Sequence, residues 1–99
     1  MSLETLTSRI RTVVGTENST TATVKFETGD GVVFIDTTQV PNVVTNEDQE
    51  AACTLEISTE NALKMIDGEL NPMMAYMTGK LKIKGDMGIA MKMAQTFGS

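Results

Sequence analysis

Apolar residues along the chain follow first a helical spacing and then a strand spacing. Over residues 3–14 they recur every three to four positions, with Glu4 in the first turn and Gly15 where a left-handed C-cap would lie. This spacing predicts an amphipathic helix whose apolar stripe packs on another element. Residues 16–21, which are polar and rich in threonine, are expected to form a connector.

The clearest strand pattern follows this connector. Apolar and polar residues alternate over residues 22–27, and residues 32–36 form a β-branched and aromatic run. The glycine-rich turn at residues 29–31 lies between the two runs. Together these three segments predict a β-hairpin.

Signals in the next stretch are weaker. Pro41 argues against a central strand, because proline cannot donate a ladder hydrogen bond. We therefore expect a short edge strand at Val43 and Val44. Residues 46–50 are acidic and polar, and we expect them to form the most mobile loop of the chain.

Strand and helix signals then follow each other directly. Alternating residues over 53–58 predict another strand with one apolar face. Ser58 or Thr59 can cap a helix that covers residues 62–66 and stops near Gly68. A strand that runs straight into a helix is therefore expected here.

Capping residues delimit the helices near the carboxyl end. Asn71 before Pro72 predicts a two-turn helix over residues 72–78, which Gly79 ends. Residues 80–84 alternate strictly and predict a strand that ends at Gly85. Asp86 can cap a last helix with two apolar stripes. The first stripe holds Met87, Ala90, Met91, Ala94 and Phe97, and the second holds Ile89 and Met93.

The order of these elements predicts an α+β fold. Helix, hairpin, strand, helix, helix, strand and helix follow each other, which favours helices covering one face of a mostly antiparallel sheet. The chain has 99 residues, of which 40% are hydrophobic and 21% charged. A chain of this length has apolar material for one core, so residues 1–99 are expected to form a single domain.

Composition excludes several classes of function. A lone cysteine, Cys53, allows no internal disulfide, and without histidine the common zinc-ligand sets cannot form, so we expect neither a metal nor a cofactor. Cys53 is expected to be a buried structural residue and Asp86 a helix cap, which leaves the chain without a catalytic group. A net charge of −5 argues against a nucleic-acid partner. Because no membrane span or secretory signal is present, we expect a soluble, cytoplasmic protein.

Charge is unevenly distributed along the chain. Of the 8 basic and 13 acidic residues, residues 1–78 hold 4 basic and 12 acidic ones, and residues 79–99 hold 4 basic and 1 acidic one. Lys80, Lys82 and Lys84 can attract a ligand carboxylate, coenzyme A phosphates or membrane head groups. Alternating lysines also serve as a solvated strand edge that prevents pairing between sheets. The sequence leaves both interpretations open.

Methionine is unusually abundant. The chain has eight methionines against three phenylalanines, one tyrosine and no tryptophan, and seven of the eight lie between Met65 and Met93. Flexible thioether side chains can simply fill a core. The predicted helix over residues 72–78 is, however, apolar almost all round, so it should meet nonpolar matter on more than one face. If exposed, such a surface marks an interaction site, and if enclosed it marks a cavity.

Two motifs near the carboxyl end resemble a known family. Gly68-Glu69-Leu70-Asn71-Pro72 and Gly79-Lys80-Leu81-Lys82-Ile83-Lys84-Gly85-Asp86-Met87 are similar to the sterol carrier protein type 2 family of non-specific lipid-transfer proteins. The resemblance is strongest over residues 54–93, and the first helix and the hairpin also lie where that family has them. It implies a five-stranded sheet, covered by helices, that encloses a hydrophobic tunnel for sterols, fatty acids, acyl-CoA or phospholipids. Carried over by position, the residues implied to line the tunnel are Phe26, Phe34, Leu55, Met65, Met73, Met74, Met77, Leu81, Ile83, Met87 and Met91.

The resemblance therefore predicts a carrier of lipid or fatty acyl ligands, as a monomer or weak dimer, with transient membrane or lipid-enzyme contacts. The chain has little after Phe97, and its last four residues are not a peroxisomal signal, which suggests a compact, bacterial-type member. Two alternatives remain open. The chain can be a substrate-binding accessory domain of a separate lipid-metabolising enzyme, or a dimerisation module that uses its methionine-rich surface.

Overall fold

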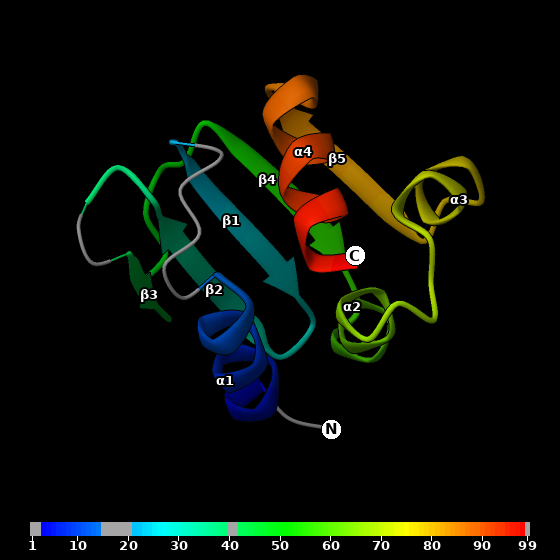
Figure 1. Ribbon diagram of the computed structural model, residues 1–99, viewed down its shortest axis with the longest axis horizontal. Helices are drawn as coiled ribbons and strands as arrows, with labels where there is room; N and C mark the ends of the chain where they lie inside the picture. Colours follow the sequence, from blue (N-terminus) through cyan, green and yellow to red (C-terminus); the bar gives the residue numbers. More distant parts are fainter. Residues whose placement is uncertain (1–2, 15–20, 40–41, 99) are drawn as a thin grey trace.

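The computed structural model describes residues 3–14, 21–39 and 42–98, and four helices and five strands lie within them (Figure 1). The helices are α1 (Leu3–Val14), α2 (Thr59–Ile66), α3 (Pro72–Met77) and α4 (Met87–Gly98). The strands are β1 (Thr23–Thr28), β2 (Gly31–Asp36), β3 (Val43–Thr45), β4 (Cys53–Ile57) and β5 (Leu81–Gly85). In this described part, no helix has the length and apolar character needed to span a bilayer.

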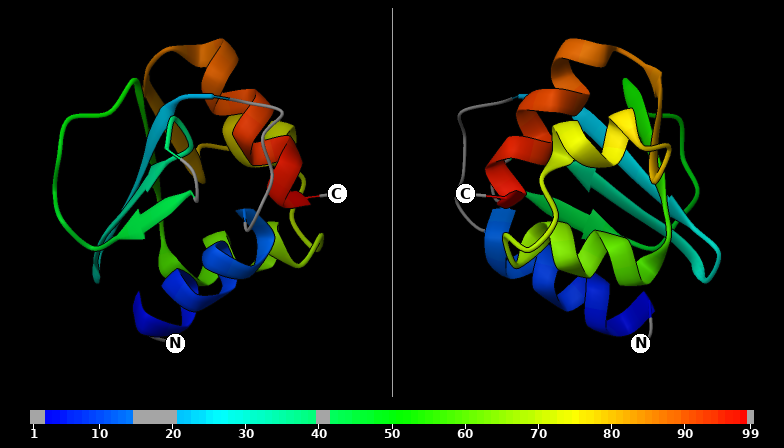
Figure 2. Two further views of the ribbon diagram at one scale, coloured as in Figure 1. Left: turned by 60° about the vertical axis from the view of Figure 1, so that its left-hand side comes forward. Right: turned by 90° about the vertical axis from the view of Figure 1, so that its right-hand side faces the viewer.

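The five strands form one mixed sheet in the order β3-β2-β1-β4-β5. Three neighbouring pairs are antiparallel, as expected, but β1 and β4 in the middle are parallel, with Val24 opposite Cys53. The helices lie on one side of the sheet, which confirms the predicted α+β arrangement (Figure 2). Val43 and Val44 lie in the edge strand β3, also as expected.

The helix-covered face of the sheet carries the core. Apolar side chains from β1, β2 and β4 alternate toward the helices, and their register partners lie on the same face. Buried side chains on this face are Val24, Phe26, Val33, Ile35, Cys53, Leu55, Ile57 and Leu81. Cys53 therefore points inward as predicted.

Helix α1 matches the predicted bounds, and its apolar stripe packs against β2, β3, α2 and α4. Leu6, Ile10 and Val14 are buried along that stripe. Two arginines on the same helix fasten it at its polar sides: Arg9 pairs with Asp67, and Arg11 donates a hydrogen bond of 3.0 Å to the Val44 carbonyl. The predicted C-cap Gly15, most of the 16–21 connector and Pro41 lie outside the described residues.

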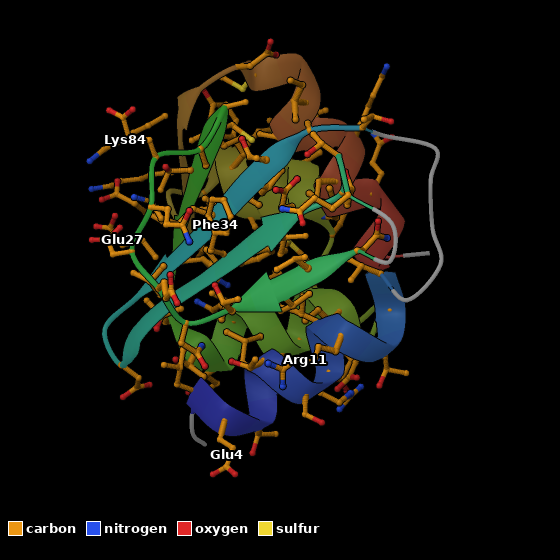
Figure 3. All side chains as sticks on the ribbon, turned by 90° about the vertical axis from the view of Figure 1, so that its left-hand side faces the viewer. Glu4, Arg11, Glu27, Phe34 and Lys84 are labelled. Atoms are coloured by element: carbon orange, nitrogen blue, oxygen red, sulfur yellow. The ribbon has the colours of Figure 1, made fainter. Side chains whose placement is uncertain are left out.

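The other face of the sheet carries Phe34, which the sequence motifs had implied to line the tunnel (Figure 3). Phe34 alternates with Val33 and Ile35 and therefore points away from the helices, yet it is only 5% exposed. Its register partner Lys25 binds Asp48 at 2.8 Å, which draws the β3–β4 loop toward this face. Phe34 thus lies on the face of the sheet that points away from the helices, between its register partners Lys25 and Thr45.

Candidate functional site

Helix α3 is short and held by caps at both ends. The side-chain oxygen of Asn71 accepts hydrogen bonds from the amides of Met73 at 2.8 Å and Met74 at 3.3 Å, and Pro72 occupies the first helical turn. The helix ends at Thr78, whose hydroxyl donates to the Met74 carbonyl, and the chain turns there through Gly79 at a φ of +80°. Both caps were predicted from the sequence.

Most of the surface of α3 faces outward. The helix packs against β5 and α4, but only Pro72 and Ala75 are buried. Its remaining apolar side chains are exposed. We use the name methionine patch for Met73, Met74, Tyr76 and Met77 of α3 together with Met87 of α4, which are 50%, 55%, 40%, 72% and 43% exposed. Among the described residues, these five are the large hydrophobic side chains that lie exposed.

Helix α4 begins at the predicted cap, since Asp86 Oδ1 accepts a hydrogen bond of 3.0 Å from the Ile89 amide. Its buried stripe consists of Ala90, Met93 and Ala94, which lie over β1, β4 and β5. The buried face of this helix thus takes residues from both predicted stripes: Ala90 and Ala94 come from the first and Met93 from the second. Met87, which was predicted in the first stripe, faces outward. The side chain of Phe97 lies outside the described side chains.

The implied tunnel residues divide into three groups. Phe26, Leu55, Met65 and Leu81 are buried between the sheet and the helices, Ile83 packs half-buried against this core, and Met91 is half-buried on α4. The second group, Met73, Met74, Met77 and Met87, belongs to the exposed methionine patch. Phe34 alone lies on the opposite face. The structure therefore brings Phe26, Leu55, Met65 and Leu81 together in one core cluster.

Small side chains set the packing of this region, and two of them, Ala90 and Ala94, lie in an apolar stripe that the sequence predicted. Ala75, Ala90 and Ala94 are fully buried where α3 and α4 approach the sheet and each other. Their spacing at i, i+4 on α4 is visible in the sequence. The sequence does not show, however, that these alanines lie where the helices come closest, because that depends on which element packs against them.

Polar chemistry in this region is sparse. The thiol of Cys53 is buried, and burial, followed by the charge of Asp86, raises its pKa to about 11. Within the described ranges, no three histidine, cysteine, aspartate or glutamate side chains are placed to hold a metal ion. Lys84 pairs with Glu56 across the strands at 3.3 Å, whereas Lys80 and Lys82 are exposed. Apolar side chains therefore define the site, and Lys82 and Lys84 lie on the other face of β5 from Leu81 and Ile83.

Comparison with protein families covers nearly the whole chain. The model of the SCP-2 sterol transfer family matches residues 2–98, nearly the whole chain. The chain belongs to the SCP-2 sterol transfer family. It is an SCP2-type lipid-binding domain, and domains of this type generally bind and transfer lipids. They are generally non-enzymatic, although some are linked to enzymes.

Individual relatives of this SCP-2 domain are much longer proteins. Sterol carrier protein 2 of Oryctolagus cuniculus is 44% identical over 52 residues, which are 52% of this chain and 10% of that protein. Hydroxysteroid dehydrogenase-like protein 2 of Xenopus tropicalis is 43% identical over 49 residues, which are 50% of this chain and 12% of that protein. The matched stretch thus spans about a tenth of these relatives.

Solved structures share the fold over nearly the whole chain. Palmitated SCP2L2 from Aedes aegypti aligns with a TM-score of 0.72 at 23% identity, covering 100% of this chain and 96% of that one. The sterol carrier protein domain 2 of Helicoverpa armigera aligns with a TM-score of 0.64 at 28% identity, covering 98% of this chain and 77% of that one. The mixed five-stranded sheet is therefore an SCP-2 fold.

Proposed function

We propose that this SCP-2 domain holds one fatty acyl chain, or a lipid of similar apolar length, between its sheet and helices α3 and α4. The family match over residues 2–98 is the observation that carries this proposal. The likeness to a solved palmitated protein supports an acyl ligand. The domain then carries the ligand through water or presents it to another protein. We also propose a cytoplasmic location, in keeping with a single buried thiol.

The side chains beneath α3 and α4 suit such a ligand. Leu55 and Leu81 of the sheet form an apolar floor, and Ile83 and Met91 at the border are half-buried. Each buried methylene of an acyl chain contributes about 0.8 kcal/mol, so affinity requires little polar contact. Methionine side chains adjust to ligands of different shape at low cost. The polar head group is expected at the exposed end of this region.

Binding can be tested on the purified protein. Native mass spectrometry followed by organic extraction should detect a copurified lipid, and fluorescent fatty acyl probes should bind at micromolar concentration. The proposal is wrong if no lipid copurifies and the probes do not bind. A stable dimer at low concentration, with no bound lipid, would instead favour the dimerisation module.

A pair of variants on α4 tests the position of the ligand. Met91→Glu places a charge at a half-buried position of α4, the helix proposed to cover the ligand, so we expect acyl affinity to fall at least about tenfold. Gln95→Glu adds the same charge to the same helix at an exposed position and should leave affinity nearly unchanged. Circular dichroism should show that both variants fold. Equal affinities would remove Met91 from the site.

The accessory-domain role is a second candidate. It is favoured because the chain matches only about a tenth of the length of these relatives, so in them the domain is one part of a longer protein. If this role is correct, an acyl-processing dehydrogenase or thiolase should turn over ligand bound to the domain faster than free ligand at equal total concentration. A simple carrier lowers the free ligand concentration and should slow the same enzyme. The comparison of initial rates decides between the two roles.

A further inference from the structure

Exposure to water divides the methionines of the chain into two groups. Seven of them lie between Met65 and Met93. Met65 and Met93 are core residues, 0% and 2% exposed, and Met91 is half-buried. The other four are the methionines of the methionine patch, which are 43% to 72% exposed. They lie on α3 and at the start of α4, on the side of the molecule that faces the viewer in the right-hand view of Figure 2.

The patch holds sulfur atoms that a dissolved oxidant can reach, whereas the thiol of the chain is protected. Cys53 is buried, and burial raises its pKa to about 11, so it is almost entirely protonated near neutrality. Peroxides attack the thiolate and react poorly with a buried thiol. A thioether carries no proton that must first be lost, so its reactivity depends on access. The exposed methionines are therefore more open to a peroxide than Cys53 is.

Helix α3 is attached to the molecule by side chains other than its methionines. Its buried residues are Pro72 and Ala75. Its caps are also independent of methionine side chains, since Asn71 accepts from backbone amides at one end and Thr78 donates to a carbonyl at the other. An oxygen added to an exposed sulfur stays in water, whereas an oxygen on Met65 would be buried in an apolar core. Oxidation of the patch is therefore compatible with the folded state.

We propose that the methionine patch is a site of reversible oxidation, at which a peroxide converts the exposed thioethers to sulfoxides. A sulfur lone pair attacks the terminal peroxide oxygen and the O–O bond breaks. The proton of that oxygen passes to the leaving oxygen, which departs as water or as an alcohol. The sulfur is oxidised by two electrons, and the peroxide is reduced by the same two. This inference goes beyond lipid carriage and requires no bound ligand.

Oxidation changes the polarity of the surface that α3 presents. Met77 lies four residues after Met73 and three after Met74, so the three side chains are neighbours on the helix surface. A sulfoxide is polar where the thioether is apolar, and methionine sulfoxide reductases convert it back. Three neighbouring sulfoxides therefore make an apolar surface polar without a change in the core. The patch is thus a reversible switch of surface polarity.

Rates of oxidation at individual residues test the assignment. After brief treatment of the purified protein with dilute hydrogen peroxide, tandem mass spectrometry should show the patch methionines oxidised at least about tenfold faster than Met65 and Met93. In concentrated urea this difference should disappear, because burial is its cause. Met1 lies outside the described residues and is scored separately. Equal rates for patch and core methionines in the folded protein would overturn the proposal.

Leucine variants of nearly equal volume test which sulfurs react. Combining Met73→Leu, Met74→Leu and Met77→Leu leaves Met87 as one of the four patch methionines, so fast peroxide uptake by the patch should fall to about a quarter. The matched control Met65→Leu removes a buried sulfur and should leave fast uptake unchanged. Circular dichroism should show that both variants fold. Undiminished fast uptake in the triple variant would overturn the proposal.

Reversibility is tested on protein oxidised at the patch. Its midpoint of urea denaturation should be nearly unchanged, and it should elute earlier from a hydrophobic-interaction column because the patch has become polar. Treatment with methionine sulfoxide reductases for both sulfoxide epimers should restore the original elution. Unfolding of the oxidised protein, or sulfoxides that these enzymes do not reduce, would contradict a reversible site.

Discussion

The backbone amide of Asp86 donates a hydrogen bond of 3.0 Å to the carbonyl oxygen of Ala52, and this bond ties the end of β5 to the start of β4. Gly85, the last residue of β5, has a φ of +89°, and a Cβ atom there would lie 2.5 Å from the same oxygen. Gly79 has a similar φ of +80°, but a Cβ atom there would meet nothing within 4 Å. A side chain at Gly79 would therefore cause backbone strain alone, whereas one at Gly85 would cause both backbone strain and a steric clash.

Alanine substitutions at these glycines should have unequal effects. Gly79→Ala should lower the free energy of unfolding by about 1–2 kcal/mol, the cost of a left-handed conformation for a residue with a side chain. Gly85→Ala should lower it by about 3–5 kcal/mol, because the new methyl group also displaces Ala52. Urea denaturation of both variants measures the difference. Equal losses would show that the β4–β5 junction yields easily.

A carboxylate at the end of β2 makes stability depend on pH. Asp36 is nearly buried and accepts hydrogen bonds from the Thr38 hydroxyl, the Gln39 side chain at 2.7 Å and the Thr38 amide at 2.9 Å. The Thr38 hydroxyl has the largest effect, and together these bonds lower the pKa of Asp36 below 3.8 although burial opposes them. The stabilisation is therefore present above that value and is lost as the pH falls through the pKa of the folded state.

Substitution of Asp36 should show this dependence. Asp36→Asn should lower the free energy of unfolding by about 1–2 kcal/mol at pH 7, because the neutral amide accepts these hydrogen bonds less strongly. The difference from the original protein should shrink below pH 4. Glu69→Gln, at an exposed position before α3, serves as the control. A difference that stays constant from pH 7 to pH 3 would contradict the assigned role of the carboxylate.

The thiol of Cys53 should be inert in the folded protein. It is buried, and its pKa of about 11 leaves little thiolate at pH 8. Labelling by a thiol reagent such as dithionitrobenzoate should therefore be at least about 100-fold slower in buffer than in 6 M urea. Because Cys53 is the one cysteine of the chain, a single rate describes the reaction. Fast labelling of the folded protein would show that β4 opens toward solvent.

Phe34 and Leu55 form a matched pair on opposite faces of the sheet. Phe34→Leu should lower the free energy of unfolding by about 1 kcal/mol and leave acyl affinity unchanged, because Phe34 points away from the helices. Leu55→Val should cost a similar amount of stability. It should also weaken acyl binding about fourfold, because it removes one methylene from the proposed floor. Isothermal titration with a fatty acid tests both variants, and an altered affinity in Phe34→Leu would return Phe34 to the site.

Much of the fold could be predicted because capping residues in the sequence mark where its helices begin. Ser58, Asn71 and Asp86 accept the hydrogen bonds that start their helices, as their positions before apolar runs predicted. The period of two likewise placed most strand side chains on the correct face. Strand order is different: alternation tells which face a residue occupies but not which strand lies beside it. The parallel pairing of β1 with β4 therefore appears only in the structure.

The candidate site was less predictable for a related reason. Every residue of α3 between its caps is apolar, so the sequence holds no polar stripe that would show which side packs. The structure buries Ala75 and exposes its methionine neighbours. Residues that the resemblance implied to line a tunnel are therefore on the surface. The sequence likewise did not show which face of β2 carries Phe34, because large apolar residues occur on both faces over residues 32–35. In both cases the sequence is apolar on every side of the element, so it does not show which side packs on the core.

The parallel pairing in the middle of the sheet divides the chain into two contiguous pieces. Strands β1 to β3 and helix α1 come from one side of the 46–52 loop, and β4, β5 and the other helices come from the other side. Each piece contains its own antiparallel pairs, and the sheet joins them only along the seam between β1 and β4. A cut in that loop would thus leave two fragments with complementary unpaired strands. The domain is accordingly suited to fragment complementation, in which refolding reports that two fused proteins have met.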